Sequence, residues 1–193
     1  MEPLGFALDA DGLWCGTQPG RATGHVRALV EGWLRQVPTL VPFHDQLVAL
    51  LTRACVAGAE AAATAVCLLA VPRESMLFTG VLCVVLRPTD TTDPDRIAAA
   101  FRAEVGDLDI DGLCEVGVVA LDDGSPAARI RVLDEVSDAR GEPVTVDSLR
   151  YYVPHPAVPV LAALEFATEH LEAGDPLIAR ADRVARTFTW VNE

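Results

Sequence analysis

The aspartates of "DLDIDG", residues 107–112, have the spacing that comes closest to a metal-binding motif in this sequence. Asp107, Asp109, Asp111 and Gly112 match the opening of an EF-hand loop, where alternate carboxylates bind calcium and the glycine permits a sharp turn. The same loop ends on a bidentate glutamate, and Val118 occupies that position here. We therefore expect hydrated aspartates at the entrance to a strand, and no metal site.

The histidines do not form a metal-binding or catalytic pattern. His170 and Glu172 have the H-x-E spacing of zinc deaminases, but the P-C-x-x-C motif that completes such a site is absent from the sequence. Serine nucleophiles have no support either, because no serine lies in a G-x-S-x-G elbow. We assign no catalytic residue and no metal ligand, and we expect the histidines on surface loops.

Two glutamates, Glu115 and Glu165, stand in the middle of apolar, strand-like segments. A pair of carboxylates can act as general acid and general base, so these two are the candidate acids of a pocket between sheet and helices. Alternation along strands also allows both to share one partly exposed sheet face with Arg129, Arg131 or Arg150. Cross-strand ion pairs would then neutralise them, and this is the reading that we favour.

The dipeptide Tyr151–Tyr152 marks a candidate contact surface. Consecutive strand residues point to opposite faces, so one tyrosine is expected in the core and the other is available at an interface. Tyrosine and arginine are both enriched at the centres of protein–protein interfaces. Arg150, Tyr152 and His155 are therefore the predicted protein-contact residues.

The charge of the chain excludes several classes of protein. Asp and Glu number 28 against 15 basic residues, which gives a formal charge of -13 and argues against binding to nucleic acid or to an anionic membrane. Every basic residue is arginine, so no lysine can form a Schiff base, bind phosphates in a Walker motif or act as a general base. We expect no cofactor.

The cysteines and apolar runs indicate a cytoplasmic location. The five cysteines are odd in number, lie far apart and contain no CxxC pair, as expected of thiols in a reducing compartment. The amino-terminal residues do not resemble a signal peptide. The apolar run 55–71 is shorter than the ~20 residues that span a bilayer.

Hydrophobic periodicity predicts an α+β fold in a single domain over residues 1–193. Apolar residues at steps of three and four predict helices, and short connections between strand-like runs force antiparallel neighbours. Asp93 and Asp175, each before a proline, are the expected helix caps, and "DADG" at residues 9–12 suggests a short hairpin. The expected helices are 23–37, 43–58, 91–106 and 174–190, and the expected strands are 62–71, 77–87, 113–121, 127–136, 144–153 and 158–168. They predict an antiparallel sheet of about six strands sandwiched by helices.

The closing third of the chain carries a family resemblance. A strand that ends in "YYVP" (Tyr151–Pro154), a second that ends in "FAT" (Phe166–Thr168), a helix and a terminal "TFTW" (Thr187–Trp190) occur in this order. This segment resembles uncharacterised actinobacterial proteins with a PsbP-like α/β/α sandwich fold. Other members of that fold are an extrinsic photosystem subunit and a nuclear-import factor that binds a small GTPase, so the resemblance implies docking and transfers no catalytic residue.

These observations favour a non-catalytic protein-binding or scaffold module, with an unknown protein or a second copy as partner. The alternative is a small-molecule-binding protein or enzyme with a pocket between sheet and helices. A third reading is an immunity or chaperone role within a secretion locus. A deep cavity where His155 or His170 approaches Glu115 or Glu165 would favour the pocket, whereas paired carboxylates on an open face would favour docking.

Overall fold

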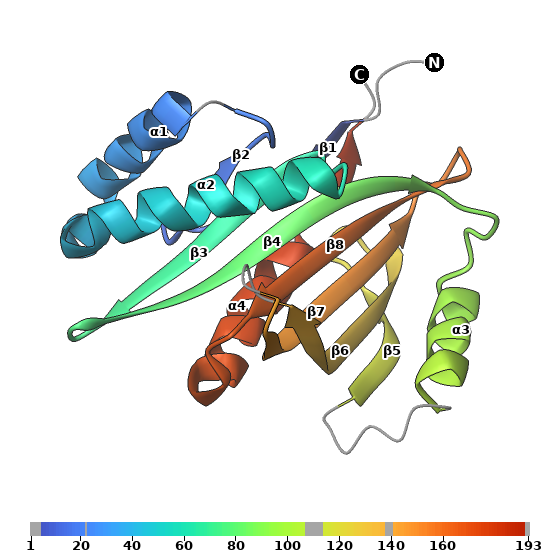
Figure 1. The fold of residues 1–193 in the computed structure, drawn as a ribbon. Helices are drawn as coiled ribbons and strands as arrows, with labels where there is room; N and C mark the ends of the chain where they lie inside the picture. The colour runs from blue at the N-terminus through green and yellow to red at the C-terminus, as the bar shows by residue number, and fades with distance from the viewer. Residues whose placement is uncertain (1–4, 22, 107–113, 138–140, 192–193) are drawn as a thin grey trace.

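The computed structural model describes residues 5–21, 23–106, 114–137 and 141–191. Its main feature is an antiparallel sheet of seven strands in the order β2-β3-β4-β8-β7-β6-β5 (Figure 1). The strands are β2 (Trp14–Thr17), β3 (Ala65–Arg73), β4 (Met76–Pro88), β5 (Cys114–Ala120), β6 (Pro126–Ser137), β7 (Pro143–Pro154) and β8 (Val160–Thr168). The predicted α+β class with a helix-covered antiparallel sheet is confirmed. The "DLDIDG" segment lies outside the described residues.

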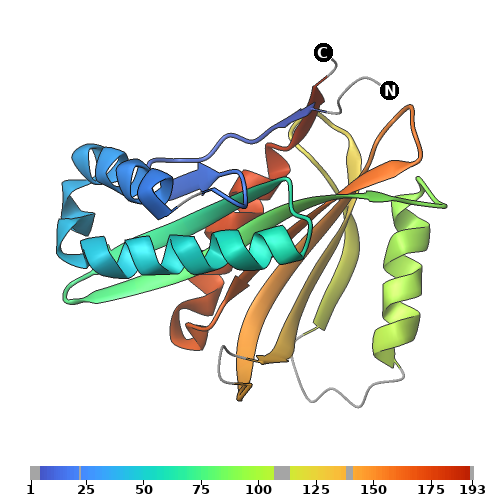
Figure 2. The same cartoon turned by 45° about the horizontal axis from the view of Figure 1, so that its top comes forward.

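The helices cover both faces of the sheet. They are α1 (Thr23–Gln36), α2 (His44–Glu60), α3 (Pro94–Gly106) and α4 (Gly174–Arg186), with 3₁₀ turns η1 (Pro38–Phe43) and η2 (Leu171–Ala173). α4 packs on one face, and α1 with α2 packs on the other, over β2, β3 and β4 (Figures 1 and 2). α3 stands beside β5 and β6, with Phe101 under the Arg150 guanidinium at 5.8 Å. We call these two sides the α4 face and the α2 face.

Each face has its own hydrophobic core, which follows from strand alternation. On β4, Phe78, Leu82 and Val84 belong to the core beneath α4, whereas Leu77 and Val81 pack with the core beneath α1 and α2. The sheet is therefore apolar on both sides at its centre. This explains why the two central runs lack the polar alternation of a one-sided strand.

The four predicted strands after α3 form the expected meander. β5, β6, β7 and β8 pair in sequence as antiparallel neighbours, and β4 pairs with β8 through the register Val81↔Ala167. This last pairing adds the β3–β4 hairpin to the meander and closes one continuous sheet. In the part of the chain that is described, no helix is both long and apolar enough to cross a bilayer.

Two local predictions were wrong at the start and end of the chain. The "DADG" segment does not close a hairpin, because β1 (Gly5–Ala7) pairs with the carboxyl-terminal β9 (Thr189–Val191) and β2 pairs with β3. Phe6 stacks on Phe188 at 5.6 Å, so apolar contact fixes the first segment there. The predicted helix 174–190 ends at Arg186, and its last residues form β9 instead.

The two predicted caps also differ in outcome. Asp93 caps α3 as expected, since its Oδ1 accepts the amide hydrogen of Asp95 at 3.0 Å. Asp175 does not cap α4, which begins after Ala173 without a side-chain cap. Its carboxylate instead accepts a hydrogen bond from Arg131 at 2.6 Å. An ion pair between the sheet and the first turn of α4 has replaced the expected local bond.

Candidate functional site

Glu115 and Glu165 lie on opposite faces of the sheet. Glu115 is on the α4 face, where its Oε2 accepts a hydrogen bond from Nη1 of Arg129 at 3.1 Å. Glu165 is on the α2 face and accepts from Nη2 of Arg87 at 3.2 Å. Glu115 pairs with Arg129, as predicted, but Glu165 pairs with Arg87, which was not among the predicted partners. The prediction that both glutamates share one face was also wrong. The two carboxylates therefore do not form one acid–base pair.

A partly buried network on the α4 face holds α4 to the sheet. Oδ1 of Asp182 accepts from Nε of Arg129 at 2.6 Å and from the hydroxyl of Tyr151 at 2.8 Å, and its Oδ2 accepts from Nε of Arg186 at 3.0 Å. Burial acts to raise the pKa of Asp182, but the hydrogen bonds from Arg129, Tyr151 and Arg186 outweigh it and lower the pKa. The pKa of the Tyr151 hydroxyl is raised, first by burial and then by this bond. A carboxylate held in its charged form by three donors is structural and is not poised to accept a proton.

A second network links β6 and β7 to the start of α4. Arg131 donates to both oxygens of Asp147, at 3.1 and 2.7 Å, and its Nη2 also reaches Asp175. These hydrogen bonds, that with Asp147 first, raise the pKa of Arg131 against the opposing effect of burial. A Cβ on Gly174 would stand 2.7 Å from Oδ2 of Asp147, so this helix start requires glycine.

The three predicted contact residues do not form one surface. Arg150 and Tyr152 lie two residues apart on the α2 face, and Arg150 pairs there with Asp134. His155 is buried in the β7–β8 connection, with its ring edge against Trp190 at 4.8 Å. Arg150 and Tyr152 therefore remain together, and His155 is separated from them.

His155 and His170 both have structural partners. Nδ1 of His155 accepts the amide hydrogens of Ala157 and Val158 at 3.0 and 3.2 Å, which assigns the ring proton to Nε2 and closes the turn. Nε2 of His170 lies 3.4 Å from the Thr79 hydroxyl, and its ring edge packs on Phe78. Within the described ranges neither ring is bonded to Glu115 or Glu165, and no three His, Cys, Asp or Glu side chains gather as a metal site.

Two separate grooves lie on the α2 face, one of 630 Å³ and one of 450 Å³. The larger groove lies between α2 and the central strands. This cavity of 630 Å³, the α2 groove, is open to solvent along one side. Its walls are mainly small or aliphatic, and Thr168 donates to the Thr79 carbonyl at 2.7 Å. The lining residues are Leu50, Arg53, Ala54, Ala57, Leu68, Thr79, Gly80, Val81, Cys83, Val144, Ala167, Thr168, Glu169 and His170.

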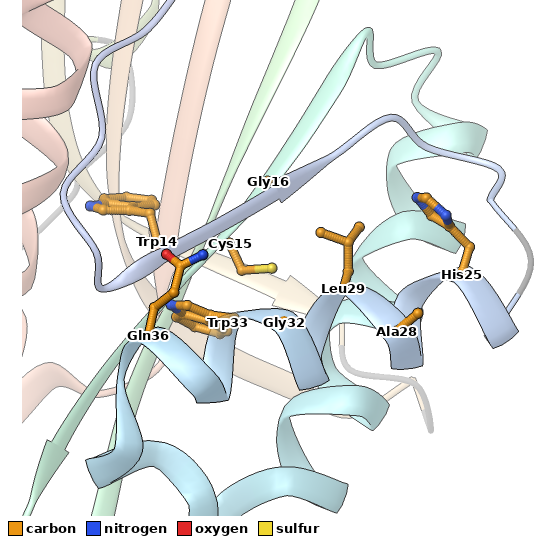
Figure 3. Close-up of a pocket in the computed structure, with 9 residues that line it drawn as sticks. All are labelled: Trp14, Cys15, Gly16, His25, Ala28, Leu29, Gly32, Trp33 and Gln36. Atoms are coloured by element: carbon orange, nitrogen blue, oxygen red, sulfur yellow. The ribbon is translucent and has the colours of Figure 1, made fainter.

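The smaller cavity, of 450 Å³, lies between β2 and α1, and we call it the β2–α1 groove (Figure 3). Trp14, Cys15 and Trp33 are buried beneath it, while His25 and Leu29 point from α1 towards the chain of β2. The Trp33 indole donates to the Gly12 carbonyl at 2.7 Å, which ties α1 to the segment before β2. Sequence reasoning missed this groove, because it predicted a short hairpin through residues 9–12 and did not predict that residues 14–17 pair with β3.

The surroundings of the thiols near these grooves favour the protonated form of the thiol, which is not the nucleophile. Burial raises the pKa of Cys15 and Cys83 to about 11 and that of Cys67 to about 12, with smaller effects from neighbouring anionic groups. A nucleophilic cysteine needs a lowered pKa, which nearby positive charge would supply.

Comparison with protein-family models and with curated proteins finds no match to this chain. The function must therefore be argued from the geometry.

Proposed function

We propose that this protein is a non-catalytic module that binds another protein through the α2 groove. One observation carries the proposal: four carboxylates on the sheet, Glu115, Asp134, Asp147 and Glu165, each pair with an arginine instead of meeting an imidazole. Chemistry at neutral pH needs acids and bases whose environments move their pKa values apart. Here these four carboxylates hold the sheet together, and more than half of the residues that line the α2 groove are aliphatic or glycine.

The lining of the α2 groove suits side chains of a protein better than a metabolite. Small-molecule sites combine an apolar cavity with a few polar groups that converge on the ligand. In this groove Thr168 donates to the backbone of Thr79, and the Thr79 hydroxyl lies beside His170, so these groups are already engaged. Ala54, Ala57 and Ala167 leave space for apolar side chains of a docked surface.

The resemblance of the closing segment to the PsbP-like sandwich also supports docking, since known members of that fold bind other proteins. We further propose that the protein acts in the cytoplasm and without a cofactor. The strongly acidic composition supports a protein partner over nucleic acid.

A small-molecule ligand is the alternative, and the size of the α2 groove favours it. The volume of 630 Å³ falls within the range of about 300 to 1,000 Å³ that ligand pockets occupy. A bound metabolite would place its apolar part against the alanines and its polar part near His170. Native mass spectrometry of the purified protein separates the two readings, because a retained small molecule adds its mass.

The test of docking uses two alanines on opposite sides of α2. Ala57 is exposed and lines the groove, so Ala57→Arg blocks it, whereas Ala59 is equally exposed and lies half a turn away. Each variant and the parent protein are used for affinity capture from the organism that encodes the chain, with mass spectrometry of what is retained. Light scattering of the pure proteins reports self-association.

A stoichiometric partner, or a dimer, that is lost in A57R and kept in A59R supports the proposal. Equal capture by all three proteins places the contact elsewhere and overturns the role of the α2 groove. A small molecule that co-purifies with the parent and A59R, but not with A57R, establishes the alternative.

A further inference from the structure

The seven-stranded sheet ends at β2, away from the α2 groove. β2 pairs with β3 on one side only, and no described strand pairs with its other edge. A free edge presents main-chain donors and acceptors to any extended chain that approaches it. Native proteins often cover such an edge, so the neighbourhood of β2 decides whether it is accessible.

The direction of the free groups follows from one hydrogen bond. The carbonyl of Leu13 accepts the amide hydrogen of Ala70 at 3.0 Å, so Leu13 faces β3. In an antiparallel pair the next residues alternate, which directs Cys15 towards β3 and the N–H and C=O of Gly16 away from it. The C=O of Trp14 points outwards as well, while its N–H donates to Asp11 at 3.1 Å.

The helix α1 runs beside this edge without filling the space next to it. The β2–α1 groove of 450 Å³ separates the two elements, with Cys15 on one side and Leu29 on the other (Figure 3). Gly32 has no side chain, so the α1 side of the groove is open in the middle of the helix, where glycine is otherwise unfavourable. A Cβ there would meet no atom closer than 3.6 Å, and that atom is the mobile end of Arg35. The wall is therefore open because it lacks a side chain, and no neighbour requires the glycine.

We propose that the β2–α1 groove binds an extended segment of a partner protein, which adds to the sheet as a strand beside β2. The segment would exchange hydrogen bonds with Gly16 and place an apolar side chain between Cys15, Leu29 and Trp33. Main-chain bonds supply affinity in this mode of recognition, and the pocket for one side chain supplies selectivity.

The geometry favours a single extended segment over a second copy of the protein. A second copy would need room beside β2 for its own β2 and for the helix α1 that contacts that strand, whereas an extended segment needs only the width of one strand. A neighbouring strand needs a spacing of only about 4.8 Å.

This inference goes beyond the proposed function, because the β2–α1 groove and the α2 groove share no lining residue. The matched variants for it are Gly32→Leu, which fills the groove from α1, and Arg27→Leu, at an exposed position on the opposite side of the same helix. Leucine favours the helix more than glycine does, so G32L should melt no lower than the parent protein. Loss of binding in G32L then reports the groove and not the fold.

The probe is a phage-displayed library of random linear peptides, selected on the parent protein and then synthesised for fluorescence anisotropy. We expect enriched peptides with one apolar residue in an extended segment, whose Kd rises by about tenfold or more in G32L and stays unchanged in R27L. An ester in place of the peptide amide that faces Gly16 should weaken binding, and the Gly16 amide should gain protection from hydrogen exchange. The amide of Gly80, in a strand paired on both sides, serves as the internal control.

Three results would overturn the inference. They are a selection without enriched peptides, peptides that bind G32L as tightly as the parent, and binding that leaves the exchange of Gly16 unchanged. A dimer in light scattering that G32L abolishes would make a second copy the occupant and reject a partner segment. A57R leaves this groove intact, so peptide binding to A57R separates a failure here from a failure of the proposed α2 groove.

Discussion

Tyr151 on β7 donates its hydroxyl hydrogen to Asp182 on α4 at 2.8 Å, and the tyrosine is fully buried. The bond joins a central strand to the last helix across the core of the α4 face. Arg129 donates to the same oxygen from the neighbouring strand β6. One carboxylate therefore fixes the position of α4 relative to two strands.

Removal of the Tyr151 hydroxyl should destabilise the fold without disturbing its packing. In Tyr151→Phe the ring remains, and Asp182 loses one of three donors in a buried setting. We expect the free energy of unfolding to fall by about 1.5 to 3 kcal/mol, the usual effect of a lost hydrogen bond to a charged group. Urea denaturation followed by circular dichroism measures it. An unchanged midpoint would show that Arg129 and Arg186 satisfy the carboxylate alone.

The pH dependence of stability should report Asp182. Its pKa in the folded state is below the usual value of about 4, so its contribution is present above that value and is lost as the pH falls through the lower, folded pKa. The stability gap between the parent protein and Asp182→Asn should thus be constant near neutral pH and shrink in acid below about pH 4. Urea titrations at a series of pH values test this. A gap that widened in acid would contradict the direction of the shift.

The two acids bonded to Arg131 should differ sharply in their effect. The Asp147 side chain is 4% exposed, and its loss leaves Arg131 buried with its main partner gone. We expect Asp147→Ala to cost about 3 to 5 kcal/mol. Asp175 is 84% exposed, so Asp175→Ala should cost less than about 1 kcal/mol. Chemical denaturation of both variants makes the comparison, and equal effects would refute the buried pairing.

Glycine should be required at Gly80 and dispensable at Gly117. A Cβ on Gly80 in β4 would stand 2.2 Å from the Phe166 ring, whereas one on Gly117 in β5 meets nothing within 4 Å. Gly80→Ala should lower the free energy of unfolding by about 1 to 3 kcal/mol, the range for overpacked cores. Gly117→Ala should be neutral or stabilising. Phe166→Leu should partly rescue Gly80→Ala, and additive effects of the two would contradict direct contact.

Much of the fold could be predicted because its strongest signals are local. Apolar residues at steps of three and four identify α1 and α2, and short turns specify the β5–β8 meander. β2 was missed because it is only four residues long and its partner β3 follows some fifty residues later. A strand of four residues is too short to show a hydrophobic period. Its pairing with β3 depends on how α1 and α2, which lie between the two strands in the chain, bring β3 back beside it.

The placement of the two glutamates shows the same limit at the level of single residues. Strand alternation correctly separated Tyr151 from Tyr152. The relative faces of Glu115 and Glu165 depend on the register of every strand between them, through the pairs Arg150↔Glu165 and Val116↔Ile130. A shift of one residue in any of these pairs would exchange the faces, and the sequence alone does not specify it.

Thiol reactivity offers a test of the whole arrangement of cysteines. Cys114 is exposed, while Cys15 and Cys55 are buried and Cys67 and Cys83 are partly covered. Burial raises the pKa of each of these four thiols, so few thiolates form near neutral pH and the attacking species is scarce. A maleimide reagent should label one cysteine rapidly in the folded protein and all five after denaturation. Intact-mass spectrometry counts the labels, and Cys114→Ser should abolish the rapid phase. Rapid labelling at a second site in that variant would show that a core covering β2, β3 or β4 opens on the timescale of the reaction.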